Sequence, residues 1–96
     1  MASAAKLMIA GSEDVQSDRS IKQLVHYHIS RLQDKNPAAR LKAINELALL
    51  GDPEALDALK AVYRDDVDAD VRKAAQDAGR VIFLKQREQN EAHDKR

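Results

Sequence analysis

The sequence predicts an all-α fold, a short solenoid of two stacked helical hairpins. Three observations support this prediction. Apolar residues recur at the i, i+3 and i+4 spacing of amphipathic helices in four separate segments. The 96 residues include only 3 glycines and 2 prolines, which argues against many strands joined by tight turns. Related residues also recur 32 positions apart, as a repeated pair of helices requires.

The four helices are expected at residues 20–33, 37–50, 53–64 and 69–85. Ser20 and Gln23 have the spacing of a capping box, with Asp18 as a competing cap, so the first helix is expected to begin near Ser20. Asn36-Pro37 and Asp52-Pro53 each combine a capping side chain with a residue whose φ already suits a first helical turn. Gly51 is expected to end the second helix in the left-handed conformation.

A glycine inside the fourth helix needs an explanation of its own. Gly79 costs about 1 kcal/mol of stability relative to alanine at such a position. We expect close packing against a neighbouring backbone to be the reason for it.

The helices define one domain over residues 18–86. Residues 1–17 are expected to be a flexible N-terminal segment, with the option of a short capping helix near residues 4–10. Residues 87–96 contain almost no apolar side chains, so we expect a charged, disordered tail.

Composition excludes several functional classes. Sixteen basic and sixteen acidic residues give a formal net charge of zero, whereas a nucleic-acid-binding protein usually carries a basic excess. The absence of cysteine removes disulfides, thiolate zinc sites and cysteine nucleophiles. No segment approaches the roughly 20 apolar residues that span a bilayer, and the apolar run Leu7-Met8-Ile9 is too short for a signal peptide. We expect a cytoplasmic protein without a membrane partner.

The repeat is clearest around two pairs of charged residues. Asp34 precedes Arg40 by six residues, and Asp66 precedes Arg72 by six. Leu24 and Leu56, Ala43 and Ala75, and Leu50 and Ile82 stand at the same offset of 32. Such a period of helix pairs is typical of an α-solenoid.

The second repeat resembles a known family. Gly51-Asp52-Pro53-Glu54-Ala55 is followed by Leu56 and Leu59, an Asp65-Asp66 turn, and Val71-Arg72 at the start of the last helix. This order is similar to HEAT repeats, and most similar to the short HEAT-like repeats of phycobilisome lyases. The resemblance is good over 47–82 and partial over 20–46, where Ala39 replaces the valine that precedes the arginine.

The resemblance implies a structural ladder of Asp34, Arg40, Asp66 and Arg72 that runs from turn to turn. Physical reasoning supports the same role. Each aspartate lies near a helix N-terminus, where the helix dipole favours negative charge. Each arginine can donate a forked pair of hydrogen bonds to a carboxylate or to turn carbonyls.

No motif points to catalysis, a metal or a cofactor. His26 and His28 are two residues apart and point to different sides of a helix, unlike the i, i+4 histidine pairs that bind zinc. Asp66-x-Asp68-x-Asp70 resembles the opening of a calcium loop, but Val71 stands where that loop needs glycine. We therefore predict a protein that is not an enzyme.

The apolar row Leu41, Ile44 and Ala48 has three interpretations. It belongs to the core, it is covered by Leu7-Met8-Ile9, or it docks another chain. The resemblance implies that the second helix of each hairpin carries outward positions for a partner. The candidate partner-binding residues are Leu41, Lys42, Ile44, Asn45, Ala48, Leu49, Lys73, Gln76, Arg80 and Phe83.

Three functions follow as hypotheses. The first is a non-catalytic protein–protein interaction module or accessory scaffold subunit, with weak homodimer formation through whichever of Phe83 and Leu84 faces outward as an option. The second, implied by the resemblance alone, is a lyase-like or chaperone-like helper of a tetrapyrrole-carrying protein. The third is a nucleic-acid-binding helical repeat, which the neutral net charge disfavours.

Overall fold

The computed structural model describes the backbone of residues 19–94 and the side chains of residues 19–90. All regular structure in this part of the chain is helical, which confirms the predicted fold class. A first helix occupies residues 19–31. It is followed by α2 (Pro37–Leu50), a 3-10 turn (Pro53–Ala55), α3 (Leu56–Asp65) and α4 (Ala69–Asp94).

The caps of α2 form as the sequence predicts. Asn36 accepts a hydrogen bond from the Ala38 N–H, and Pro37 opens the helix. Gly51 has φ 67°, and its N–H donates to the carbonyl of Leu47. These devices depend only on neighbouring residues, so the bounds 37–50 were predictable from local chemistry.

Three helices have boundaries that differ from expectation. Residue 19 is already helical, so Ser20 is not the N-cap of the first helix, which ends at 31 instead of 33. The third helix begins as a 3-10 turn, because Asp52 accepts from the Glu54 N–H directly after Pro53. The fourth helix continues to Asp94, past the expected end at 85.

The helix α4 extends through residues 87–94, where the sequence predicts a charged tail. Its glutamine, arginine and glutamate side chains are good helix formers, so the helix continues although it has little apolar surface to bury. The expected N-terminal segment 1–17, including the capping helix near 4–10, lies outside the described residues.

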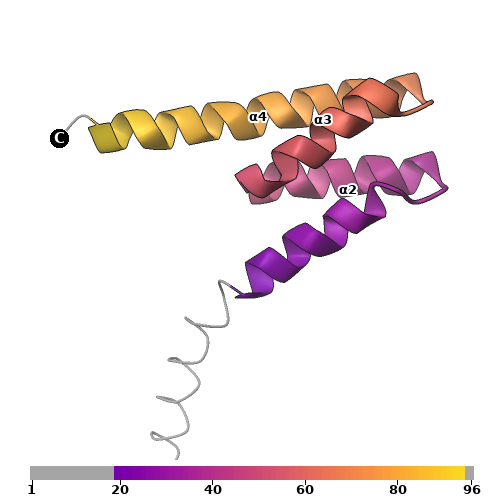
Figure 1. The fold of residues 1–96 in the computed structure, drawn as a ribbon, viewed down its shortest axis with the longest axis horizontal. Coiled ribbons are helices and arrows are strands. Elements are labelled where there is room, and N and C mark those ends of the chain that lie inside the picture. Colours follow the sequence, from indigo (N-terminus) through magenta and orange to yellow (C-terminus); the bar gives the residue numbers. More distant parts are fainter. Residues whose placement is uncertain (1–18, 95–96) are drawn as a thin grey trace, which may run out of the picture.

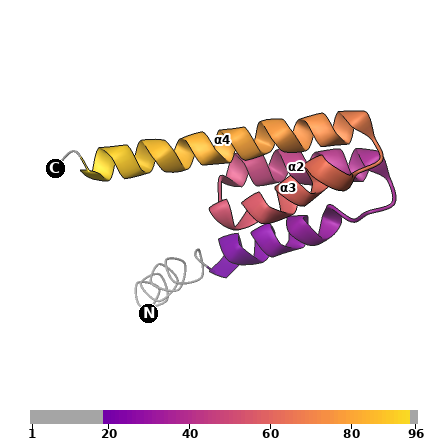
Figure 2. The same cartoon turned by 45° about the horizontal axis from the view of Figure 1, so that its top comes forward.

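The two hairpins stack side by side (Figures 1 and 2). Both α2 and α3 pack against α4, and the turns within the two hairpins lie at the same end of the molecule. The core between the helices is aliphatic. Its largest fully buried side chains are Ile44, Leu47, Leu59, Ile82, Val25 and Val71.

The two described helix glycines have opposite surroundings. A Cβ atom on Gly51 would meet Lys85 Cδ at 3.3 Å, and the positive φ alone would strain any L-residue there. A Cβ atom on Gly79 would meet nothing within 4 Å. The expectation that Gly79 permits close packing inside the fold is therefore wrong, because the space above it is empty.

These surroundings predict opposite effects of alanine. Gly51→Ala should lower the free energy of unfolding by about 1–2 kcal/mol because it forces alanine into the left-handed region. Gly79→Ala should raise it by about 1 kcal/mol through helix propensity. Urea titration of dilute protein measures both. Equal signs for the two substitutions would contradict this account, and Gly51→Asn serves as a control that should lose less than Gly51→Ala.

Candidate functional site

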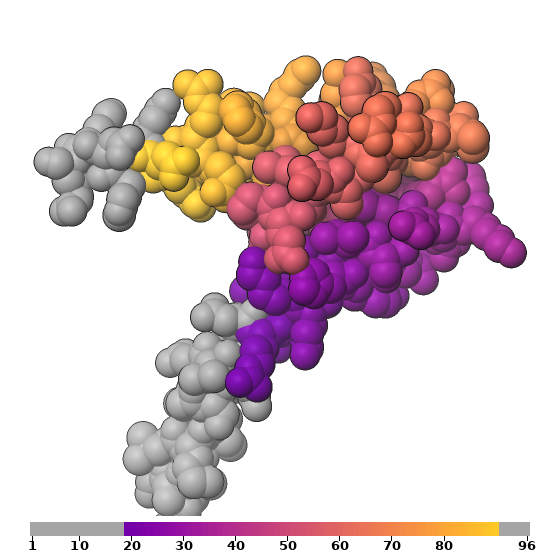
Figure 3. Space-filling model, viewed as in Figure 1, coloured from indigo at the N-terminus to yellow at the C-terminus, as the bar shows by residue number. Residues whose placement is uncertain are grey.

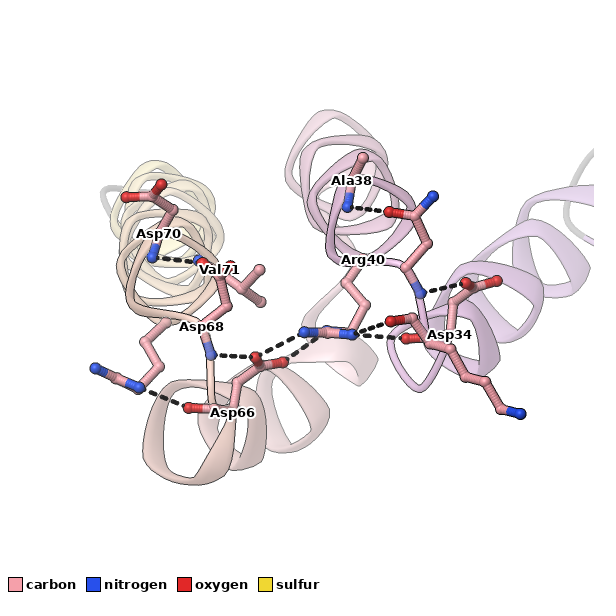
Figure 4. A network of polar contacts seen from close by, with 10 residues as sticks. Asp34, Ala38, Arg40, Asp66, Asp68, Asp70 and Val71 are labelled. Carbon is pink, nitrogen blue, oxygen red and sulfur yellow. Dashed lines mark hydrogen bonds and ion pairs between the residues drawn. The ribbon is translucent and has the colours of Figure 1, made fainter.

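A part-buried cluster of polar contacts lies where the two hairpin turns meet (Figure 4). Arg40, near the start of α2, reaches across to the turn before α4. Its Nε donates to Asp66 Oδ2 at 2.8 Å, and its Nη2 donates to Asp66 Oδ1 at 3.0 Å. Little of either side chain is exposed, 11% for Arg40 and 8% for Asp66. This forked ion pair ties the first hairpin to the second.

The remaining ladder bonds join side chains to turn carbonyls. Arg40 Nη1 donates to the carbonyl oxygens of Asp34 and Lys35 at 2.8 and 3.2 Å. Arg72 Nη1 donates to the Asp66 carbonyl at 2.7 Å. Each arginine therefore closes the turn six residues before it, and Arg40 also binds the carboxylate of the next turn. The four ladder residues of the sequence analysis lie together in this arrangement.

Asp66 titrates below its usual range. Burial of its carboxylate disfavours the charged form, but the Asp68 N–H and the Arg40 guanidinium favour that form more strongly. The net result is a lowered pKa for Asp66. The carboxylate is therefore charged at neutral pH, as the ion pair requires.

The other turn carboxylates cap backbone groups. Asp34 accepts from the Asn36 N–H, and Asp68 accepts from the Asp70 and Val71 N–H groups. The Asp66-x-Asp68-x-Asp70 sequence thus serves the start of α4 as a capped turn. Within the described residues, no three histidine, cysteine, aspartate or glutamate side chains are grouped as metal ligands.

A second ionic cluster joins the first helix to the start of the second hairpin. Lys22 Nζ lies 2.9 Å from Asp52 Oδ2 and 3.3 Å from Glu54 Oε1. The ring Nε2 of His26 also contacts Glu54. The hydrogen bonds of Glu54 with His26 and then Lys22 lower its pKa, and the bond from Lys22 is the main cause of the lowered pKa of Asp52. His26 is therefore hydrogen-bonded to Glu54. The ring of His28 packs edge-on against the Tyr27 ring.

The apolar row on α2 is part of the core. Ile44 is fully buried, and Leu41 and Ala48 are partly buried against the core cluster. These three candidate residues cannot form an open docking row, and Ile44 has no surface to offer. The alternative cover, Leu7-Met8-Ile9, lies outside the described residues. The helical period was the same for a core row and a docking row, so the sequence left both open.

The other candidate residues are exposed, but they do not share one surface. Asn45 and Leu49 face solvent on α2, and Leu49 is 75% exposed. On α4, Lys73 and Arg80 share the solvent side with Val81 and Leu84. We call this the α2–α4 face: Asn45, Leu49, Lys73, Asp77, Arg80, Val81 and Leu84. Lys42 is also exposed, but it borders a pocket together with Tyr27, His28 and Arg31 of the first helix.

Gln76 and Phe83 belong to a groove between α3 and α4. Its volume is about 390 Å³, and its lining includes Leu56, Tyr63 and Gly79. Phe83 is 54% exposed and Tyr63 is 46% exposed. The helical periods of the sequence did not predict this α3–α4 groove. The available signal was the repeat, because Gly79 occupies the position of Leu47, 32 residues earlier.

Positions 32 residues apart differ in polarity between the two hairpins. At each outer end of the stack a polar residue stands where the other hairpin has an apolar one. Ala55, Ala74 and Ala78 are buried or half-buried in the second hairpin, and their equivalents in the first are Gln23, Lys42 and Glu46. Val25, Leu32 and Ile44 are buried in the first hairpin, and their equivalents in the second are Asp57, Arg64 and Gln76. The hairpins therefore bury apolar surface against each other and present polar ends outward.

The ladder predicts an unequal cost of removing two arginines. Arg40→Met leaves the Asp66 carboxylate and two turn carbonyls without their donor, so stability should fall by about 2–4 kcal/mol. Arg64, whose ion pair with the neighbouring Asp65 is open to water, is the matched control. Arg64→Met should leave the melting temperature unchanged. Similar losses in both variants would contradict a special role for Arg40.

The lowered pKa values predict acid sensitivity. The folded-state pKa of Asp66 lies below its unfolded value, so its contribution is complete above about pH 4 and is lost as the pH falls through the folded pKa. Melting temperature should therefore decline below about pH 4. The decline should be shallower in Arg40→Met, which removes one cause of the shift. An equally steep decline in both proteins would show that Asp66 does not contribute to it.

Comparisons with known proteins agree with this architecture. A sequence model described as HEAT repeats matches residues 3–79, well over half of the chain. The match begins within the N-terminal segment and ends before the last turns of α4. Searches of curated proteins and of solved structures gave no significant match. No described helix is long and apolar enough to cross a membrane. With two stacked hairpins and a family match of this length, the chain belongs to the HEAT-repeat family.

Proposed function

We propose that this chain is a non-catalytic protein-binding module that uses the α2–α4 face. HEAT repeats commonly serve as scaffolds for protein interactions, because their helix surfaces form extended binding faces. On this chain the face combines exposed Leu49, Val81 and Leu84 with charges of both signs.

One observation carries the proposal. Among the described charged residues of this face, Lys73, Asp77 and Arg80 make no hydrogen bond or ion pair. The charged groups of the turns, in contrast, are used by the fold itself. The α2–α4 face therefore offers apolar anchors and free charges without weakening the ladder. Such a mixture of anchors and polar contacts is what protein interfaces use.

The same reasoning disfavours the two alternative functions. Arg40 and Arg72, two of the basic residues available for phosphates, are bound to turn oxygens and Asp66. The neutral chain thus has fewer free cations than its composition suggests. A helper role for a tetrapyrrole-carrying protein rests on the resemblance of residues 47–82 alone, and no contact in the described residues adds support to it.

Site-specific photocrosslinking tests the proposed face. A photoreactive residue at position 45 should give an adduct of defined mass in extract of the native host. The same residue at position 23, on the polar end of the first helix, should not. Leu49→Asp should abolish the adduct from position 45 because a charge disrupts an apolar anchor.

The matched control is Val67→Asp, which changes a 90% exposed valine in the turn before α4. It should leave the adduct intact. Identical adducts from positions 45 and 23, or an adduct insensitive to Leu49→Asp, would refute binding through the α2–α4 face.

A further inference from the structure

The empty space over Gly79 is unexplained by the folded monomer. Alanine would fit there and would favour the helix by about 1 kcal/mol. A glycine at this position is useful only if another group comes within contact distance of the α4 backbone. No described part of the chain does so.

The groove around Gly79 is shaped for an apolar side chain. Leu56 and Leu59 line it from α3, and Ala75 and Gly79 line it from α4. Tyr63 and Phe83 stand exposed at its walls. Aromatic rings favour further aromatic contacts in offset or edge-on geometry.

The C-terminal part of α4 extends past the other helices. In Figures 1 and 3 the yellow part of α4 projects beyond α3 and the first helix. Most described residues from 83 to 90 are exposed, and the family match ends at 79. Helices gain most of their stability from tertiary packing, so packing against another chain would stabilise this exposed extension.

The polar ends of the stack restrict how a second copy can bind. A head-to-tail copy would place Gln23, Lys42 and Glu46 of its first hairpin against the groove, where an apolar group is needed. A two-fold arrangement instead sets groove against groove. The rim carries one acidic and one basic residue, Asp57 and Lys60. Two symmetry-related rims therefore bring charges of both signs together, and like-charge repulsion does not prevent the contact.

We propose that two copies form a two-fold dimer in which their α4 helices cross antiparallel near residue 81. Gln76, Gly79, Phe83 and Gln86 follow the i, i+3, i+7, i+10 pattern and share one side of α4. With the axis at this position, Phe83 of each copy lies over Gly79 of the other. Gln76 lies opposite the partner's Gln86, where their amides can exchange hydrogen bonds.

This arrangement also uses the projecting helix. Residues 83–90 of one copy run along residues 72–79 of the other, so the extension covers the α3–α4 groove. The contact is short, and the dimer is accordingly weak and concentration-dependent. The dimer contact leaves the α2–α4 face free. The dimer proposal therefore does not depend on the proposed function.

Sedimentation equilibrium tests the dimer, and substitutions test its geometry. The full chain should shift from monomer to dimer with rising concentration. Phe83→Asp should abolish the shift, and Gly79→Ala should raise the dissociation constant at least about tenfold while stabilising the dilute monomer. Leu49→Asp, on the α2–α4 face, should leave dimerisation unchanged.

Disulfide trapping fixes the orientation, because the chain has no natural cysteine. Under mild oxidation, the double variant Gln76→Cys and Gln86→Cys should form a covalent dimer. Each single variant should stay monomeric. The two positions are ten residues apart on one helix, about 15 Å, which is too far for a bridge within one chain.

Three results would overturn the proposal. One is a monomer at the highest soluble concentration. Another is a dimer unaffected by Phe83→Asp. The third is efficient crosslinking of Gln76→Cys alone, which would indicate a parallel pair.

Discussion

The forked ion pair between Arg40 and Asp66 is the constraint that orders the rest of the molecule. It is the one described salt bridge with little exposure on both partners, and it connects the two hairpins through their turns. Charges removed from water must be fully bonded to be tolerated. Arg40 meets that requirement with four acceptor contacts, which position both turns relative to α2 and α4.

This constraint explains why a small aliphatic core is sufficient. Among the described residues the core contains no buried polar or charged side chain, and its largest fully buried members are aliphatic and come from every helix. Such a core alone does not fix one relative position of the two hairpins, because aliphatic side chains can pack in several ways. The directional bonds of the ladder supply that selection at one end, and the Lys22, Asp52 and Glu54 contacts tie the hairpins together farther along the first helix.

The outer ends of the two described hairpins carry polar residues where the equivalent positions of the other hairpin are apolar. Gln23 and Glu46 lie at one end, and Asp57 and Arg64 lie at the other. Polar outer faces keep the end of a helical stack compatible with water. The surfaces that remain for binding are the solvent side of α2 and α4, and the groove at the outer end of the second hairpin, in which Gly79 lies.

Local chemistry in the sequence by itself determined the helical class, the bounds of α2 and the composition of the ladder. Caps and turns act over a few residues, and the six-residue spacing of Asp34 from Arg40 is set within one turn. Tertiary structure alone decided that Ile44 is buried, that Gly79 faces empty space and that Phe83 borders a groove. A helical period shows which side chains share a face, but only the packing of neighbouring helices determines whether that face is covered.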